Sequence, residues 1–178
     1  ATAIHSLELL AASLHGMLTS SANRWFSLRF KETALNESDE AREWLEASVD
    51  LMYLAFSRSN FQQEIFENYH DLIAFGTSCL MVEEDEDDII RFSARHIKEI
   101  YIEENKKGLI DNVYRKFKLT ANQVVEKFGI ENVSKEVTET FKTHPYDDIE
   151  ICHIVRPRSI YDSSKKDKQN MLFQSIYF

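Results

Sequence analysis

The fold class is decided by one stretch, Leu109-Ile110-Asp111-Asn112-Val113-Tyr114-Arg115-Lys116-Phe117, together with Leu119-Thr120-Ala121-Asn122-Gln123 directly behind it. Side chains alternate in character over residues 109–117, which is the period of a half-buried β-strand. Thr120 and Gln123 then have the spacing of a capping box, in which the two side chains satisfy backbone N–H groups at a helix start. Gly129 supplies the stop signal of that helix. A strand that passes directly into a helix predicts a mixed α+β fold.

The sequence after Gly129 predicts a second helix and a return to strands. A short helix is expected over residues 134–142, and Pro145 interrupts the pattern. Residues 149–155 alternate again and predict a strand, and the polar, lysine-containing residues 161–170 predict an exposed loop before a last strand at residues 174–178. The helix pair at residues 120–142 is therefore expected to be an insertion between two strands.

Residues 1–76 are expected to be mainly helical. Apolar residues three and four apart predict a helix over residues 2–19, and a Ser59–Gln62 capping box predicts another that ends at Gly76. A third helix between these two should bury one apolar stripe in the core of the protein. Its members are Trp44, Ser48, Leu51 and Ala55, with Leu45 and Met52 beside them. The alternating residues 25–30 predict a strand between the first two helices.

Residues 77–178 are expected to be mainly sheet, with the helical insertion at 120–142. Strands at residues 79–82, 89–92, 96–103 and 109–117 predict an antiparallel meander. The expected architecture is a single α+β domain over residues 1–178, in which N-terminal amphipathic helices pack on an antiparallel sheet of roughly four to six strands. Both ends of the chain suggest a piece of a longer protein.

Composition and charge narrow the function classes. The hydrophobic share of 43% excludes wholesale disorder. The sequence contains no run of about 18 apolar residues, so it predicts no membrane span. The chain has 21 Lys+Arg against 30 Asp+Glu, a net charge of −9. Six of the acids form one run, residues 83–88, which is expected to be a solvated turn. Such an acidic chain is poorly suited to wrap nucleic acid, because that binding depends on cationic contacts to phosphate.

No motif in the sequence predicts catalysis, a cofactor or a metal. There is no glycine-rich phosphate loop and no Gly-x-Ser-x-Gly nucleophile elbow. The six histidines never pair at helical i, i+4 spacing, and the acidic run lacks the glycine and later glutamate of a calcium loop. Cys79 and Cys152 lie in apolar runs and are expected to be buried thiols of an intracellular protein. Catalytic, cofactor-binding and metal-binding residues are therefore all expected to be absent.

One segment offers an alternative function. Residues 119–142 have the order helix, glycine, short turn, helix, which is the order of a helix-turn-helix DNA-binding element. The second helix would read the major groove, yet Lys135 and Lys142 are balanced by Glu136 and Glu139. Without net positive charge this helix gains nothing from displacing phosphate counterions. A DNA-binding regulator or adaptor that uses residues 119–142 stays the alternative, and the residues that would face DNA are not identified.

Several stretches together resemble the portal protein, the head-to-tail connector of short-tailed bacteriophages. They occur in order over about residues 1–160 and comprise residues 9–19 with 25–28, residues 59–83, residues 108–123 and residues 153–158. The third stretch, Gly108-Leu109-Ile110-Asp111-Asn112-Val113-Tyr114-Arg115-Lys116-Phe117, is the most specific of them. One departure from the pattern is Ser20-Ser21, where a proline is expected after the first helix.

This resemblance implies a structural role at one vertex of the phage head. It implies a twelve-fold ring through which the terminase packaging motor moves DNA into the head, and which then retains the DNA. It also implies contacts with the capsid shell and the tail adaptor proteins, passage of double-stranded DNA without sequence recognition, and no membrane. The location implied is the virion, with the host cytoplasm before assembly. The present residues resemble the outer, N-terminal wing region of such a subunit.

Overall fold

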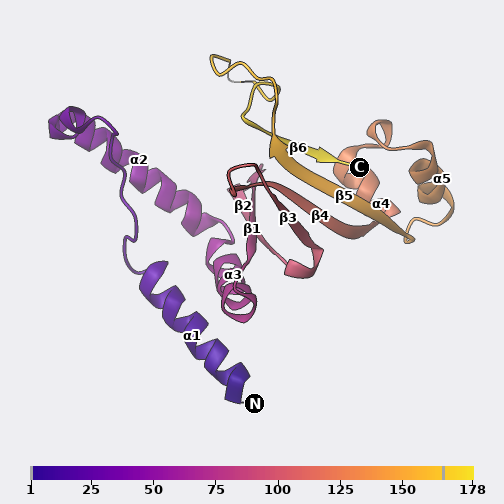
Figure 1. Ribbon diagram of the computed structural model, residues 1–178, viewed down its shortest axis with the longest axis horizontal. Helices are drawn as coiled ribbons and strands as arrows, with labels where there is room; N and C mark the ends of the chain where they lie inside the picture. The colour runs from indigo at the N-terminus through magenta and orange to yellow at the C-terminus, as the bar shows by residue number, and fades with distance from the viewer. Residues whose placement is uncertain (1, 166) are drawn as a thin grey trace. The chain divides into compact units, whose positions relative to one another are not determined.

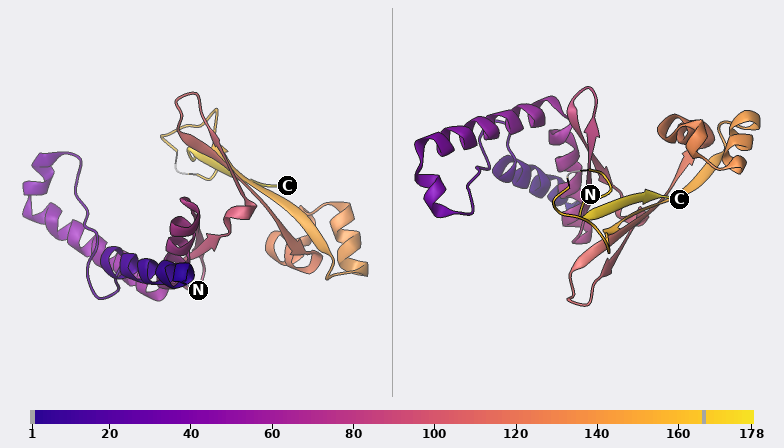
Figure 2. Two further views of the ribbon diagram at one scale, coloured as in Figure 1. Left: turned by 60° about the horizontal axis from the view of Figure 1, so that its bottom comes forward. Right: turned by 90° about the horizontal axis from the view of Figure 1, so that it is seen from above.

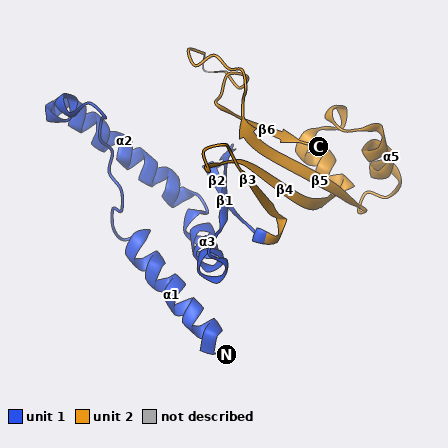
Figure 3. Cartoon of the chain, viewed as in Figure 1, with its two compact units in different colours: residues 1–97 blue, residues 98–178 orange. Residues whose placement is uncertain are grey.

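The computed structural model describes residues 2–165 and 167–178 and confirms the predicted α+β class (Figure 1). The described residues form helices, an antiparallel pair of strands, and a separate four-stranded antiparallel sheet. The chain divides into two compact units, residues 1–97 and residues 98–178 (Figure 3). The division falls between the second and third strands rather than at residue 76, where the composition changes. Each unit is described separately below.

Unit 1 contains three α-helices and a hairpin. The helices are α1 (Thr2–Leu18), α2 (Asp39–Arg58) and α3 (Phe61–Phe75), with a 3-10 turn, η1 (Thr33–Glu37), before α2. Strands β1 (Cys79–Asp85) and β2 (Ile89–Arg95) form the hairpin, which packs on α3. Gly76 ends α3 with φ of 75°, in the left-handed region that favours glycine, as predicted. Helix α1 also packs on α3, where the Thr19 hydroxyl lies 3.2 Å from the Tyr69 hydroxyl.

The core of unit 1 is built from aromatic rings. Phe61 is buried at the start of α3, and its ring lies 5.0 Å from that of Phe92 on β2 and 4.7 Å from that of Phe56 on α2. The Trp25 ring stacks on Phe61 with a centroid separation of 5.7 Å. Offset and edge-to-face aromatic pairs of this kind add to the stability that burial alone provides. Residues from four different segments therefore meet at Phe61.

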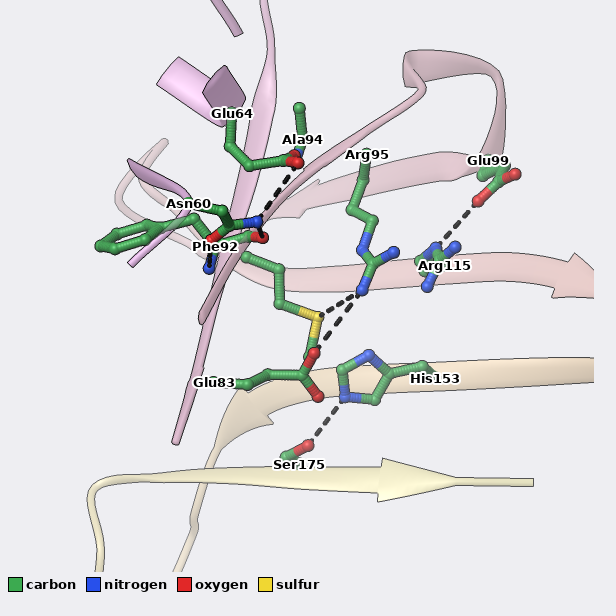
Figure 4. Close-up of polar contacts among 11 residues, drawn as sticks. Asn60, Glu64, Glu83, Phe92, Ala94, Arg95, Glu99, Arg115, His153 and Ser175 are labelled. Carbon is green, nitrogen blue, oxygen red and sulfur yellow. Dashed lines mark hydrogen bonds and ion pairs between the residues drawn. The ribbon is translucent and has the colours of Figure 1, made fainter. Parts of the chain in front are cut away.

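The side chain of Asn60 joins α3 to β2 through two hydrogen bonds (Figure 4). Its Nδ2 donates to the Phe92 carbonyl at 2.8 Å, and its Oδ1 accepts from the Phe92 N–H at 2.9 Å. Glu64 continues the contact one turn later, because its Oε2 accepts from the Ala94 N–H at 2.6 Å. The predicted Ser59–Gln62 capping box is therefore wrong. The Ser59 hydroxyl accepts from the Phe61 N–H and donates to the Phe56 carbonyl, and Asn60 is the residue that precedes the helix.

The predicted strand at residues 25–30 is also wrong. This segment is extended but forms no ladder with another strand. The Tyr53 hydroxyl accepts from the N–H groups of Trp25 and Phe26, and the Asn36 side chain bonds both the N–H and the carbonyl of Phe30. Side chains on α2 and η1 thus supply the partners that a neighbouring strand would have supplied. The alternating apolar side chains remain because one face of the segment packs on α2.

Unit 2 contains a four-stranded antiparallel sheet in the order β3-β4-β5-β6. Its strands are β3 (Ile100–Glu104), β4 (Ile110–Thr120), β5 (Asp148–Pro157) and β6 (Phe173–Tyr177), and a short turn, η2 (Ile97–Glu99), precedes β3. The helix pair lies between β4 and β5 as predicted, and consists of α4 (Ala121–Phe128), η3 (Ile130–Asn132) and α5 (Lys135–Thr143). The predicted continuous meander over residues 77–118 is wrong, because β2 and β3 belong to different sheets.

Replacing Asn60 tests the connection between α3 and β2. Asn60→Ala removes both side-chain bonds and leaves the backbone N–H and carbonyl of Phe92 without these partners. We expect a loss of about 2 kcal/mol in the free energy of unfolding of unit 1, the usual cost of unpaired polar groups that are shielded from water. Urea unfolding followed by tryptophan fluorescence measures it, because both tryptophans, Trp25 and Trp44, lie in unit 1. The control is Asn23→Ala at an exposed position, and equal unfolding midpoints for the two variants would contradict the assignment.

Candidate interaction surfaces

The helix pair of unit 2 begins where β4 ends. Thr120 is the last residue of β4 and the cap of α4, and the predicted capping box is confirmed. The Gln123 N–H donates to the Thr120 hydroxyl at 3.3 Å, and the Gln123 side chain accepts from the Thr120 N–H at 3.0 Å. Ser134 caps α5 by accepting from the Val137 N–H. Two views of the chain show both helices at one end of the long strands (Figure 2).

The helix pair covers an apolar cluster on one face of this sheet. Phe117, Val124 and Ile151 are buried at its centre, and Phe128, Val133 and Val137 pack around them with part of their surface exposed. A groove of about 770 Å³ remains between the helices and the strands, and residues such as Val137, Ile149 and Tyr177 line it. A helix pair that covers the sheet would bury Phe128 and Phe141 beneath it. Both are only half-buried, and Phe128 lines the open groove.

Charge around the helix pair does not favour nucleic acid. Glu136 lies at the groove, whereas Asp148 and Glu150 of β5 form ion pairs with Lys118 and Lys116 across the sheet. Lys135 and Lys142 are exposed at the two ends of α5, separated by most of its nine residues. Carboxylates at the same surface repel phosphate, and two lysines give little counterion release. The link between α4 and α5, residues 129–134, also includes the 3-10 turn η3 rather than one short turn.

Phe128 tests how the helix pair is held to the sheet. Its ring lies 5.0 Å from that of Tyr177 on β6. We expect Phe128→Ala to cost about 2 kcal/mol of unit 2 stability, less than the roughly 3–5 kcal/mol for a fully buried phenylalanine, because the ring is only partly buried. Amide hydrogen exchange in α4 and β5 measures the change. The matched control is Tyr146→Ala, whose side chain is 82% exposed and which should leave exchange unaltered. An equal effect of the two changes would contradict this packing.

The other face of the same sheet carries cross-strand polar pairs. Lys116 Nζ lies 2.9 Å from Glu150 Oε1, and the Tyr114 hydroxyl donates to Glu103 Oε2 at 2.7 Å. These bonds raise the pKa of the Lys116 ammonium and of the Tyr114 hydroxyl, because Glu150 and Glu103 stabilise the protonated forms. Both lysine and glutamate are more than half exposed, so the ion pair contributes little to stability. The cross-strand pairs on this face are therefore exposed to solvent.

Two polar side chains inside unit 2, His153 and Arg115, have structural partners. His153 is buried, its Nε2 lies 2.7 Å from the Ser175 hydroxyl, and its ring stacks on Tyr177 at 4.0 Å (Figure 4). Arg115 bonds Glu99 at 2.8 Å and lies over the ring of Phe117. Cys79 and Cys152 were expected to be buried, and both are instead partly exposed. Within residues 2–165 and 167–178, no group of three or more metal-ligating side chains is placed to hold an ion.

The acidic run forms the turn of the β1–β2 hairpin. Asp85 Oδ1 accepts from the N–H groups of Asp87 and Asp88, and these bonds to Asp88 and Asp87 lower the pKa of the Asp85 carboxyl below its ordinary value of 3.8. The turn closes at Ile89 with φ of 72°, in the left-handed region. A β-branched residue is strained in that conformation. The prediction of a solvated turn over residues 83–88 holds only for residues 86–88, because Glu83, Glu84 and Asp85 belong to strand β1.

Replacing Ile89 tests whether its left-handed backbone conformation destabilises unit 1. Ile89 is 54% exposed, so Ile89→Asn removes little packing while asparagine tolerates a positive φ. We expect unit 1 to gain about 1 kcal/mol of stability, the usual cost of a left-handed conformation for such a residue. Ile90→Asn is the control, because Ile90 is half-buried and pairs with Glu84 in the regular part of the hairpin. Tryptophan fluorescence in urea should show the two variants shifting in opposite directions, and a loss for both would contradict the strain.

Two helices of unit 1 expose apolar side chains. The predicted buried stripe of α2 is wrong, because Leu45 and Val49 are the buried positions and Trp44 and Leu51 are 61% and 67% exposed. On α1, only Ala11 is fully covered, and Met17 is 81% exposed. Contiguous exposed apolar side chains mark surfaces that bind a partner. Among the described helices none is long and apolar enough to cross a membrane.

Comparison with known proteins places the chain among phage connectors. It is 32% identical over 178 residues to the "Probable portal protein" of Bordetella phage BPP-1, a match that covers 99% of this chain and 32% of the relative. It is 31% identical over 172 residues to the "Portal protein" of Salmonella phage epsilon15, with 96% of this chain and 31% of the relative covered. The chain thus spans about a third of the length of these relatives. The profile of the family described as bacteriophage head to tail connecting protein matches residues 1–178, so the chain belongs to that family.

Proposed function

We propose that residues 1–178 form one part of a longer subunit of the phage head-to-tail connector, the portal. In this proposal twelve subunits form a ring at one vertex of the head. The observation that carries it is the exposed apolar surface of α1 and α2 in a chain that belongs to the connector family. Apolar helix faces of this extent are stable in water only when another surface covers them.

In the same proposal the subunit is structural and performs no catalysis. Its partners are further copies of itself, the terminase packaging motor, the capsid shell and the tail adaptor proteins. Double-stranded DNA passes through the ring without sequence recognition. The net charge of −9 supports this, since an acidic wall does not retain the phosphate backbone. The subunit would act in the virion after assembly in the host cytoplasm.

The test is assembly of the full-length protein. We expect closed rings with a central channel in electron micrographs, and a mass of about twelve subunits by native mass spectrometry. Duplex DNA added to the rings should show no salt-sensitive, sequence-selective retention, and Lys135→Ala with Lys142→Ala should change nothing. A dimer that binds one duplex sequence selectively, and loses it with these two lysines, would establish the DNA-binding alternative instead.

A further inference from the structure

Strand β5 is paired along most of its length on one side and along only half of it on the other. Strand β4 lies opposite residues 148–155 of β5, whereas β6 lies opposite residues 153–157 and stops partway along β5 (Figure 1). One more residue joins the second ladder, because the Phe178 N–H donates to the Cys152 carbonyl at 2.9 Å and the Cys152 N–H donates to the Phe178 carbonyl at 3.0 Å. Among the described residues, no strand lies opposite residues 148–151 on this side of β5, and these four residues are here called the free edge.

The main-chain groups of Glu150 point out from the free edge. In an antiparallel sheet, successive residues direct their N–H and carbonyl groups to opposite neighbouring strands. Cys152 directs both groups toward β6, so Glu150, two residues earlier, directs both groups to the same side, beyond the end of β6. A row of such groups is a template for another strand. The free edge can therefore pair with a strand that continues the register of β6.

The apolar groove of unit 2 lies where that strand would run. The groove is lined by the free edge, by the end of β6 and by the helix pair, which contributes partly buried apolar residues such as Phe128. Tyr177 lies opposite His153 and lines the groove, and every second residue of a strand points to the same face. In the same register, position 179 would lie opposite Ile151 and position 181 opposite Ile149. Both side chains would then point into the groove.

We propose that the residues directly after Phe178 in the longer subunit extend β6 along the free edge and fill this groove, an inference that rests on the proposed function because it takes the chain to be part of that subunit. The curated relatives support further residues, since the chain spans about a third of their length. The bonds between Phe178 and Cys152 already hold the chain in register, so the extension requires no loop closure. A strand from another copy would compete for the free edge with residues that are tethered beside it.

The neighbouring side chains define the chemistry of the added segment. Positions 179 and 181 face apolar residues, and apolar side chains that are β-branched or aromatic suit such a site in a strand. Position 180 would lie on the other face, opposite Glu150, whose carboxylate lies 2.9 Å from Lys116 Nζ. Like charges directly opposite each other destabilise a strand pair, so a residue without negative charge is expected there. Charged residues at both 179 and 181 of the full-length sequence would contradict the inference.

Disulfide formation in the full-length protein tests the register. With Cys79→Ser and Cys152→Ser as background, Ile149→Cys and a cysteine at position 181 should form a disulfide within one chain. Directly opposite residues of antiparallel strands have Cα atoms about 4.5–5.5 Å apart, which a disulfide can span. The matched control places the second cysteine at position 180, which faces the other side of the sheet and should give no disulfide. Peptide mapping under non-reducing conditions identifies the bond. A disulfide only between chains, or equal yields for positions 180 and 181, would overturn the inference.

Amide hydrogen exchange of the unsubstituted full-length protein gives a second readout. The Glu150 N–H should exchange as slowly as the Cys152 N–H, which is bonded to Phe178. Exchange at Glu150 that is roughly tenfold or more faster would overturn the inference, because it would show an edge without a partner strand. If rings form and Glu150 exchanges fast, the inference fails and the proposed function stands. If no rings form, the proposed function fails, and the disulfide and the exchange rate still decide whether β6 is extended.

Discussion

The two hydrogen bonds between the Asn60 side chain and the backbone of Phe92 organise unit 1. They bring the start of α3 against β2, so that Phe61 and Phe92 come into ring contact. Trp25, which belongs to a segment without helix or strand, stacks on the ring of Phe61. An amide side chain offers one donor and one acceptor, as a neighbouring strand does. The aromatic core therefore depends on a polar contact, because ring burial alone does not set the position of β2.

The surfaces of the chain differ in the kind of partner they suit. The helix pair of unit 2 borders an open groove lined mainly by apolar side chains and Glu136, and the opposite sheet face presents exposed cross-strand ion pairs. Neither arrangement attracts phosphate. Helix α1 instead presents exposed apolar side chains with no lysine or arginine among them, a composition typical of surfaces that another protein surface covers.

The candidate interface could be predicted only in part from the sequence. The α2 stripe of Trp44 and Leu51 is visible as a period of three and four, but the same period serves a core and a subunit contact equally well. The structure buries Leu45 and Val49, which line one cavity with residues 24–29, whereas Trp44 stays exposed although its ring stacks on Phe30. Nothing in a local pattern reveals which of two apolar faces another segment will occupy.

Local signals in this sequence determined the elements whose stabilising contacts lie within a few residues. Thr120 and Gln123 start α4, Gly76 ends α3, and alternating residues give β4 and β5, since caps and strand periods are short-range properties. Tertiary structure decided every case in which a backbone group had competing partners. Residues 25–30 form no strand, because the Tyr53 hydroxyl, some 27 residues away, accepts from the N–H groups of Trp25 and Phe26. Asn60 bonds the backbone of a strand 32 residues away instead of capping its own helix. Such choices depend on which segments meet in space, and a local pattern carries no information about that.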